Sequence, residues 1–281
     1  MGATAFLIAE FLDIPYIEVV VAAALPALIY YVILFAQVDF MAKDNNLKGL
    51  SRSELPRFSL LLRTRGLHLV PIFLLIFLMF GIGLQPAKSA IISGFSAFFF
   101  GLIMRESKLN KESLSSFVNS VSQTMIPIIL IGGAAGIIVG VLNITGLGFN
   151  LTLGLTEIGK NYGLISMLIL TGMVAIILGM GMPTAAVYIV LSVVLAPAVI
   201  EMGIPVLAAH LFIFYFGLLS MITPPVAVAS FVAAGIADAS MWKTSFTAMK
   251  LGIAAYLLPF LFVFNDSLLF KGTWIEILYI S

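Results

Sequence analysis

Long apolar runs with few charges dominate this chain, and several reach the roughly 20 residues that a helix needs to cross a bilayer. These runs cover residues 17–40, 67–85, 87–104, 118–143 and 242–265. A further apolar stretch, residues 1–12, would be about 18 Å long as a helix, which is too short to cross. The pattern predicts an all-α, polytopic membrane protein.

Two apolar regions are interrupted where an ordinary membrane helix would continue. The first interruption is residues 179–184 (Gly-Met-Gly-Met-Pro-Thr), and the second is residues 223–225 (Thr-Pro-Pro). In lipid, irregular backbone is tolerated only where it is buried in protein or lines a cavity. Both interruptions are therefore candidate sites.

The prolines predict which backbone oxygens these sites would offer. Pro183 lacks the amide that would bond the carbonyl of Gly179, and the Pro-Pro pair does the same to the carbonyls of Ser220 and Met221. Two helix ends would then present free carbonyl oxygens and the negative end of a helix dipole at membrane depth. This arrangement suits a small hard cation and favours a transporter.

The residues around the interruptions allow more than one path through the membrane. Residues 164–200 could cross twice or form one re-entrant hairpin, and we take the hairpin as our prediction. Residues 206–238 are interpreted as one broken crossing. Charge alone does not separate hairpin from crossings, because both place Lys243 on the same side.

Composition and charge fix the class of protein and the side of its loops. Hydrophobic residues make up 62% of the chain and charged residues 10%, whereas soluble domains have about 25% charged residues. A net charge of +1 gives no reason to expect nucleic acid, and the lack of cysteine excludes disulfides. Residues 42–66 carry six Lys and Arg residues against two acids, so this loop is predicted to be cytoplasmic. Residues 53–63 and 110–117 are predicted to be interfacial helices.

A shift of 225 positions lays the start of the chain over the segment that follows Pro225. The aligned identities are Phe6 with Phe231, Ala9 with Ala234, Asp13 with Asp238, Ala23 with Ala248, Tyr31 with Tyr256, and Phe35 with Phe260. Sidedness places Asp13 outside and Asp238 inside, so the two copies are predicted to be inverted. The counterpart of the Pro-Pro would precede residue 1, and we interpret the chain as an N-terminally truncated fragment.

Three motifs carry a resemblance to a known family. Residues 179–188 (GMGMPTAAVY), 209–217 (AHLFIFYFG) and 220–226 (SMITPPV) resemble the DctM-like large permease subunit of tripartite ATP-independent periplasmic (TRAP) transporters. The chain is most similar to fused small-plus-large permeases that partner TAXI-type binding proteins. Residues 1–11 resemble the stretch after a Pro-Pro in that family's first half.

The resemblance implies an elevator-type symporter in the cell inner membrane rather than an enzyme. It implies sodium as the coupling ion, with no other cofactor, and an organic carboxylate anion as the substrate. The implied partners are a periplasmic substrate-binding protein, a small permease subunit or fused small-subunit domain, and the lipid bilayer.

Carried to this sequence, the resemblance implies an ion and substrate site formed by the hairpin tip and the broken crossing. Its residues would be Gly179, Gly181, Pro183, Thr184, Ser220, Thr223, Pro224, Pro225 and Val226. Sodium would be held by backbone carbonyls of the two glycines and Ser220 and by the hydroxyl of Thr223.

These inferences divide the chain into four parts. They are residues 1–41, the end of the first repeat; 42–112, the basic loop and a two-span linker; 113–265, the second repeat with hairpin 164–200 and broken helix 206–238; and 266–281, a tail or the start of another helix.

Three alternatives to a transport subunit stay open at this point. The chain could be an inert truncated fragment, an ion channel or an intramembrane enzyme. The enzyme is disfavoured because no His-Glu-x-x-His or Gly-x-Ser-x-Gly motif occurs, and because His68 and His210 both lie at span ends.

Overall fold

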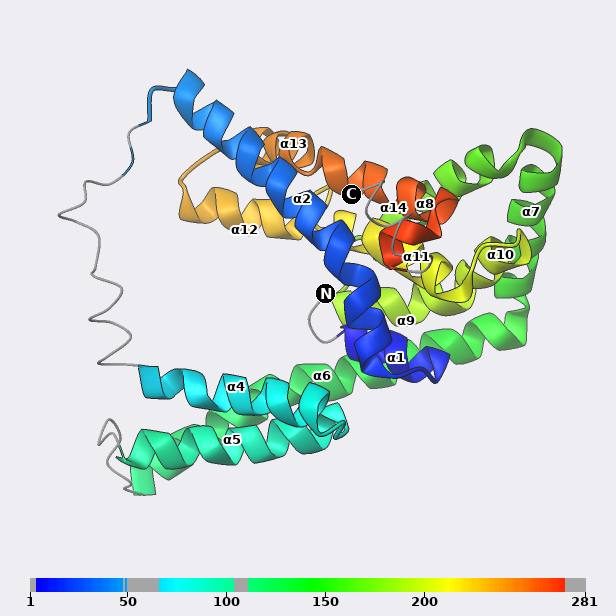
Figure 1. Ribbon diagram of the computed structural model, residues 1–281. Coiled ribbons are helices and arrows are strands. Elements are labelled where there is room, and N and C mark those ends of the chain that lie inside the picture. The colour runs from blue at the N-terminus through cyan, green and yellow to red at the C-terminus, as the bar shows by residue number, and fades with distance from the viewer. Residues whose placement is uncertain (1–3, 48, 50–65, 104–110, 271–281) are drawn as a thin grey trace. The chain divides into compact units, whose positions relative to one another are not determined.

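The computed structural model describes residues 4–47, 49, 66–103 and 111–270, and every regular element in those ranges is a helix. The all-α prediction is therefore confirmed for this part of the chain (Figure 1). The chain forms two compact units. The larger combines residues 1–44 with 130–281, and the smaller comprises residues 45–129. The interfacial helix expected at residues 53–63 lies outside the described ranges.

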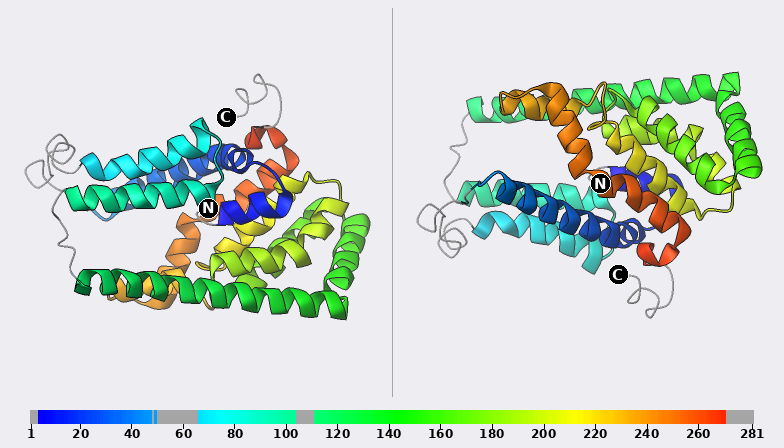
Figure 2. Two further views of the ribbon diagram at one scale, coloured as in Figure 1. Left: turned by 90° about the horizontal axis from the view of Figure 1, so that it is seen from below. Right: turned by 90° about the horizontal axis from the view of Figure 1, so that it is seen from above.

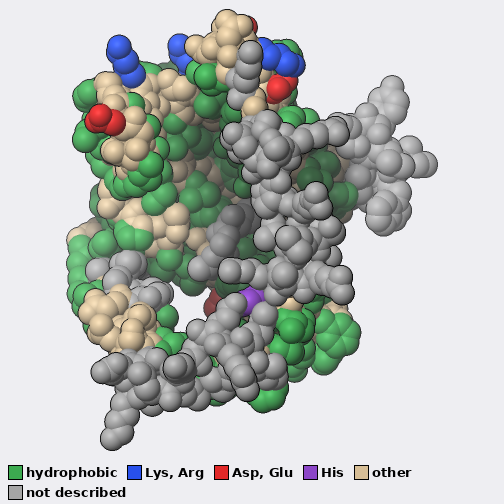
Figure 3. All heavy atoms as spheres, turned by 90° about the vertical axis from the view of Figure 1, so that its left-hand side faces the viewer, with side chains coloured by type: hydrophobic (Ala, Val, Ile, Leu, Met, Phe, Trp, Pro, Cys, Tyr) green, Lys and Arg blue, Asp and Glu red, His purple; other side chains and the backbone are tan. Residues whose placement is uncertain are grey.

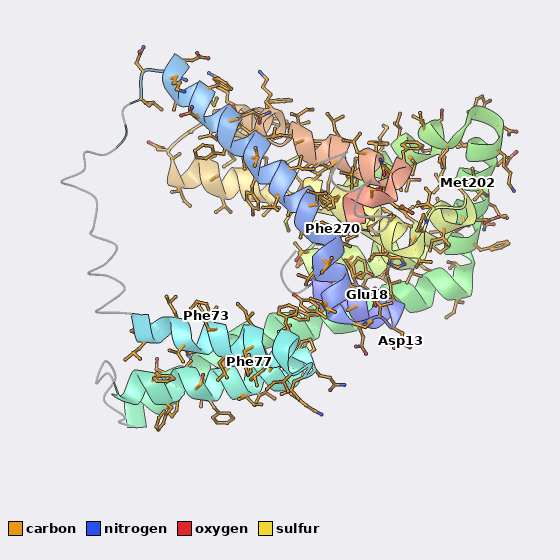
Figure 4. All side chains as sticks on the ribbon, in the orientation of Figure 1. Asp13, Glu18, Phe73, Phe77, Met202 and Phe270 are labelled. Carbon is orange, nitrogen blue, oxygen red and sulfur yellow. The ribbon has the colours of Figure 1, made fainter. Side chains whose placement is uncertain are left out.

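The smaller unit is built around two packed apolar segments. One runs through η1 (Gly66–Leu69), α4 (Val70–Ile76) and the π-helical turn η2 (Phe77–Gly81), and the other is α5 (Pro86–Ile103). Phe73 and Phe77 lie on the first segment (Figure 4), and both side chains are largely exposed, as lipid-facing residues would be.

α6 (Lys111–Thr145) begins in the smaller unit and continues into the larger one as a single helix. The segment expected as an interfacial helix at residues 110–117 is helical from Lys111 onward and continues without a break into α6; its interfacial position stays a prediction. α7 (Leu147–Tyr162) follows after a bend of 67° and is also helical, in a region where no span was predicted (Figure 2). The polar residues of α7 interrupt the apolar pattern by which a membrane helix is recognised. Leu155 and Gly159, which lie one turn apart, are nevertheless part of a buried stripe.

Among the described residues, two helices, both in the larger unit, are long and apolar enough to cross a membrane. They are α2 (Tyr16–Asp44) and the continuous segment Met241–Phe264, which contains α13 (Met241–Leu251) and α14 (Ile253–Phe264). A third span results if the bent pair of α6 and α7 is one crossing. In Figure 3, charged side chains gather along the upper edge of the described surface, above a largely hydrophobic area.

The two segments aligned by the 225-residue shift have the same local geometry. α1 (Thr4–Leu12) and α12 (Val228–Ile236) are short helices, and each ends at an aspartate in the left-handed region, with φ of 50° at Asp13 and 49° at Asp238. The matching capping bonds are Ile14 N to Ala9 O at 3.0 Å and Ala239 N to Ala234 O at 2.9 Å. This is the Schellman arrangement of a helix C-terminus.

The long helices that follow these caps begin 225 positions apart, at Tyr16 and Met241. Figures 1 and 2 show α2 and the α13–α14 segment running in opposite directions, and these helices contact each other. Asp13 lies at the turn between α1 and α2, close to Glu18 (Figure 4). The shared cap and the opposed directions support the predicted inversion.

α11 (Val206–Leu219) is the centre of the larger unit. Its side chains are buried on nearly every side, including those of Phe212 and Phe214, which is typical of a helix that is hydrophobic all round. It contacts its neighbours α8 (Leu164–Gly179) and α9 (Thr184–Val194), as well as α14 and α10 (Ala196–Glu201).

Glycines allow α8, α9 and α11 to approach closely. A Cβ atom at Gly217 on α11 would lie 2.5 Å from Val187 Cγ1 and 2.8 Å from Leu191 Cδ1, both on α9. A Cβ at Gly172 on α8 would lie 2.9 Å from the ring of Phe216. The helices therefore meet at distances that only glycine permits.

We expect Gly217→Ala to lower the unfolding free energy by about 1–3 kcal/mol, because the added methyl overpacks the contact with α9. Gly154→Ala is the matched control, since no atom lies within 4 Å of a Cβ at that position in α7. It should be neutral or stabilising by up to about 1 kcal/mol. Thermal unfolding of the detergent-solubilised protein measures both, and equal midpoints would contradict the close packing.

Candidate functional site

The first interruption is a tight turn between α8 and α9. α8 ends at Gly179, Gly181 has a φ of +77°, and Pro183 in extended conformation immediately precedes α9, which begins at Thr184. Glycine adopts this positive φ without strain, and proline suits the entry to a helix because it needs no amide partner there. These local preferences explain why the apolar run turns back at this place.

The second interruption separates α11 from α12. α11 ends at Leu219, whose carbonyl accepts from the amides of Ile222 at 3.1 Å and Thr223 at 3.0 Å. The chain then passes through the Pro-Pro pair, and α12 starts at Val228. Ala227 has a φ of 25°, an uncommon conformation for a residue with a side chain.

The structure brings these two interruptions into contact. A Cβ atom at Gly179 would lie 2.8 Å from Ser220 Oγ and 3.0 Å from the carbonyl oxygen of Gly217. A Cβ at Gly181 would lie 3.8 Å from Val226 Cγ1. The C-terminal ends of α8 and α11 are therefore adjacent, and the hairpin tip touches the loop that leads to α12.

Two of the carbonyls expected to be free are in fact bonded. The Gly179 carbonyl accepts from the amide of Met182 at 3.3 Å, because the chain turns tightly enough to supply a different donor. The Met221 carbonyl accepts from the amide of Ala229 at 3.0 Å, since the loop folds back. Within the described residues the Ser220 carbonyl accepts no hydrogen bond. A carbonyl oxygen has two lone pairs, so that of Gly179 can still contact a cation.

The two hydroxyl groups of the break are oriented by the last turn of α11. Ser220 Oγ donates to the carbonyl of Gly217 at 2.6 Å, and Thr223 Oγ1 donates to that of Leu219 at 2.6 Å. Carbonyl oxygens can only accept, so both protons point back into the helix. The oxygen lone pairs are left to face other groups, as a cation requires.

Not all the predicted site residues come together. Gly179, Gly181, Ser220 and Val226 make the contacts between the interruptions. The hydrogen bonds of Thr223 lead to α11 and to Tyr256 on α14, at 2.6 Å, rather than to the hairpin. The remaining predicted residues shape the backbone: Pro183 and Thr184 at the start of α9, and Pro224 and Pro225 between the half-helices.

The N-termini of two helices, α9 and α12, follow directly after the interruptions. Neither α9 nor α12 has a side-chain hydrogen bond at its N-cap, which leaves positive dipole ends. Ser230, in the first turn of α12, has a buried hydroxyl with no hydrogen-bond partner among the described residues. Uncapped amides and a spare hydroxyl are groups that bind anions.

A buried polar pair fastens α9 to α11. Tyr188 Oη and His210 Nδ1 are 2.8 Å apart, and both side chains are buried. The Tyr188 ring also makes edge contacts with Phe214 on α11, at a centroid distance of 6.1 Å, and with Phe11 on α1, at 5.7 Å. Sequence analysis placed His210 at a span end and found no partner for it, because the pair joins residues 22 positions apart.

Membrane-length helices packed around a centre where two helices break side by side define a membrane protein of the transporter type. The chain belongs to the family described as Tripartite ATP-independent periplasmic transporter, DctM component, whose model matches residues 1–277. No curated protein matches the chain.

The family identifies the chain as the membrane permease component of a TRAP transporter, not an enzyme. TRAP transporters work with a periplasmic binding protein and a small subunit.

We expect Tyr188→Phe to lower the unfolding free energy by about 1–3 kcal/mol, because it leaves the buried His210 nitrogen without a partner. Replacing both residues, as Tyr188→Phe with His210→Leu, should recover part of the loss, since no polar group is then left unpaired. Tyr162→Phe is the control, because that ring is 76% exposed. The measurement is the midpoint of thermal unfolding of each variant in detergent. A double variant less stable than Tyr188→Phe would contradict the pairing.

Proposed function

We propose that this permease subunit imports an organic carboxylate anion in symport with sodium. The observation that carries the proposal is the contact between Gly179 and Ser220, which sets the C-terminal ends of α8 and α11 against each other. Both helix dipoles then present their negative ends to one place. A small cation bound there would be stabilised by the two dipoles together.

The available ligands favour sodium. The proposed ligands are neutral oxygens: the carbonyls of Gly179, Gly181 and Ser220 at the contact, and the hydroxyl of Thr223 further along the break. Unwound backbone and half-helix C-termini are the groups that coordinate sodium in secondary transporters. Because Ser220 and Thr223 donate their protons to α11, their oxygens can face the ion.

The N-termini of α9 and α12 are suited to the anionic substrate. They lie directly after the two interruptions, so anion-binding amides and cation-binding oxygens would be neighbours. The buried hydroxyl of Ser230 adds a hydrogen-bond donor for a carboxylate. A cation held close by would raise the affinity for the anion, which is the electrostatic basis of coupling.

In this proposal residues 164–200 are a re-entrant hairpin and residues 206–238 a broken crossing, and together they carry ion and substrate as an elevator. Residues 1–41 supply the corresponding half-helix and span of an inverted first repeat, and residues 42–112 the linker. The chain would span the cell inner membrane several times and receive its substrate from a TAXI-type periplasmic binding protein. The small subunit would be separate or fused.

We expect Thr223→Val to raise the half-saturating sodium concentration for uptake about tenfold or more. The substitution keeps the shape of the side chain but removes the hydroxyl oxygen. The interaction of that oxygen with a charged group is worth about 1.5–3 kcal/mol. The measurement is uptake of labelled carboxylate by the complete complex in proteoliposomes, as a function of sodium at constant ionic strength.

Thr247→Val is the matched control, because Thr247 Oγ1 also donates to the carbonyl four residues earlier, that of Lys243, but lies outside the break. It should transport like the unmodified complex. Sodium-independent uptake, or an unchanged sodium curve for Thr223→Val, would reject the assigned ion site.

A further inference from the structure

Tyr256 on α14 reaches the break between α11 and α12. Its hydroxyl lies 2.6 Å from Thr223 Oγ1, across 33 positions of sequence. The ring is partly buried, and α14 also meets the break at its start, where a Cβ on Gly252 would lie 2.9 Å from Ile222 Cδ1. The span after the break is therefore in direct contact with it.

The direction of this hydrogen bond follows from the neighbouring groups. Thr223 Oγ1 has one proton, and the Leu219 carbonyl at 2.6 Å can only accept it. Tyr256 must then be the donor to Thr223 Oγ1. The second lone pair of Thr223 Oγ1 makes neither of these hydrogen bonds. The protons of both hydroxyls point away from the group that this lone pair faces.

Other aromatic residues of α14 contact α11 without a hydroxyl. Phe260 makes edge contacts with Phe212 at a centroid distance of 5.5 Å and with Phe216 at 5.6 Å. A phenylalanine would therefore satisfy ring packing on this helix. The hydroxyl is what distinguishes Tyr256 from these phenylalanines, and its partner in the structure is Thr223.

We propose that Tyr256 is a positioning residue that holds the Thr223 hydroxyl in the orientation that binds sodium, an inference that rests on the proposed function. Without the tyrosine hydroxyl, the Thr223 hydroxyl keeps only its bond to the Leu219 carbonyl, so one hydrogen bond instead of two fixes the direction of its free lone pair. Preorganised oxygens lose less free energy to ordering when the ion binds. Tyr256 thus raises sodium affinity without itself being a ligand.

The test is a double-mutant cycle of Tyr256→Phe and Thr223→Val in the reconstituted complex. We expect Tyr256→Phe to raise the half-saturating sodium concentration about three- to tenfold, the value of one hydrogen bond, while the maximal uptake rate at saturating sodium stays unchanged. Combined with Thr223→Val, it should add nothing, because the group it positions is gone. Tyr162→Phe, on an exposed ring, should leave the sodium curve unchanged.

The outcomes separate this inference from the proposed function. If Thr223→Val shifts the sodium curve and Tyr256→Phe does not, or if their effects add fully, the positioning role is wrong and the ion site stands. If Tyr256→Phe lowers the maximal rate at every sodium concentration, its role is structural and the inference is overturned. If neither variant changes sodium dependence, the proposed function fails with it.

Discussion

The structure depends on one constraint: backbone groups released from a helix inside an apolar environment must find new partners. α8 and α11 both stop short, at Gly179 and Leu219, and the carbonyls of Gly179 and Met221 are bonded within the interruptions. Met182 and Ala229 supply the replacement amides. The hydroxyl of Ser220, a residue whose carbonyl accepts no hydrogen bond among the described residues, lies where the helix ends meet.

Glycine makes that meeting possible. At Gly179 any side chain would collide with Ser220 and with the backbone of Gly217, and at Gly217 it would collide with α9. Gly179, at the end of α8, and Gly217, near the end of α11, therefore allow the two helix ends to approach each other closely. The Tyr188–His210 bond adds a polar contact between α9 and α11. In the proposed function, ion binding would use the same close approach as packing.

Much of the arrangement of helices and interruptions could be predicted from the sequence, because proline and glycine affect the backbone conformation at and next to their own positions. The two interruptions, the long spans and the 225-residue repeat were all visible in the spacing of Gly, Pro and apolar residues. The repeat gains weight from a detail that spacing does not show, the identical caps at Asp13 and Asp238.

What could not be predicted depends on contacts between distant residues. Proline showed which amides are missing, but not that other amides would bond Gly179 and Met221 instead. The partners Tyr256 and His210 are each one polar group in an apolar run, and their roles appear only when the helices are assembled. α7 was missed because a half-buried helix next to a bundle has too many polar positions to resemble a span.

The most direct test of the central claim is an experimental structure of the complex, determined in sodium and again in potassium. In sodium, we expect an ion density between the ends of α8 and α11, in contact with oxygens of Gly179, Ser220 and Thr223, and its loss in potassium. Continuous helices through 179–184 or 223–225, or an ion density elsewhere with these oxygens turned away from it, would contradict the account.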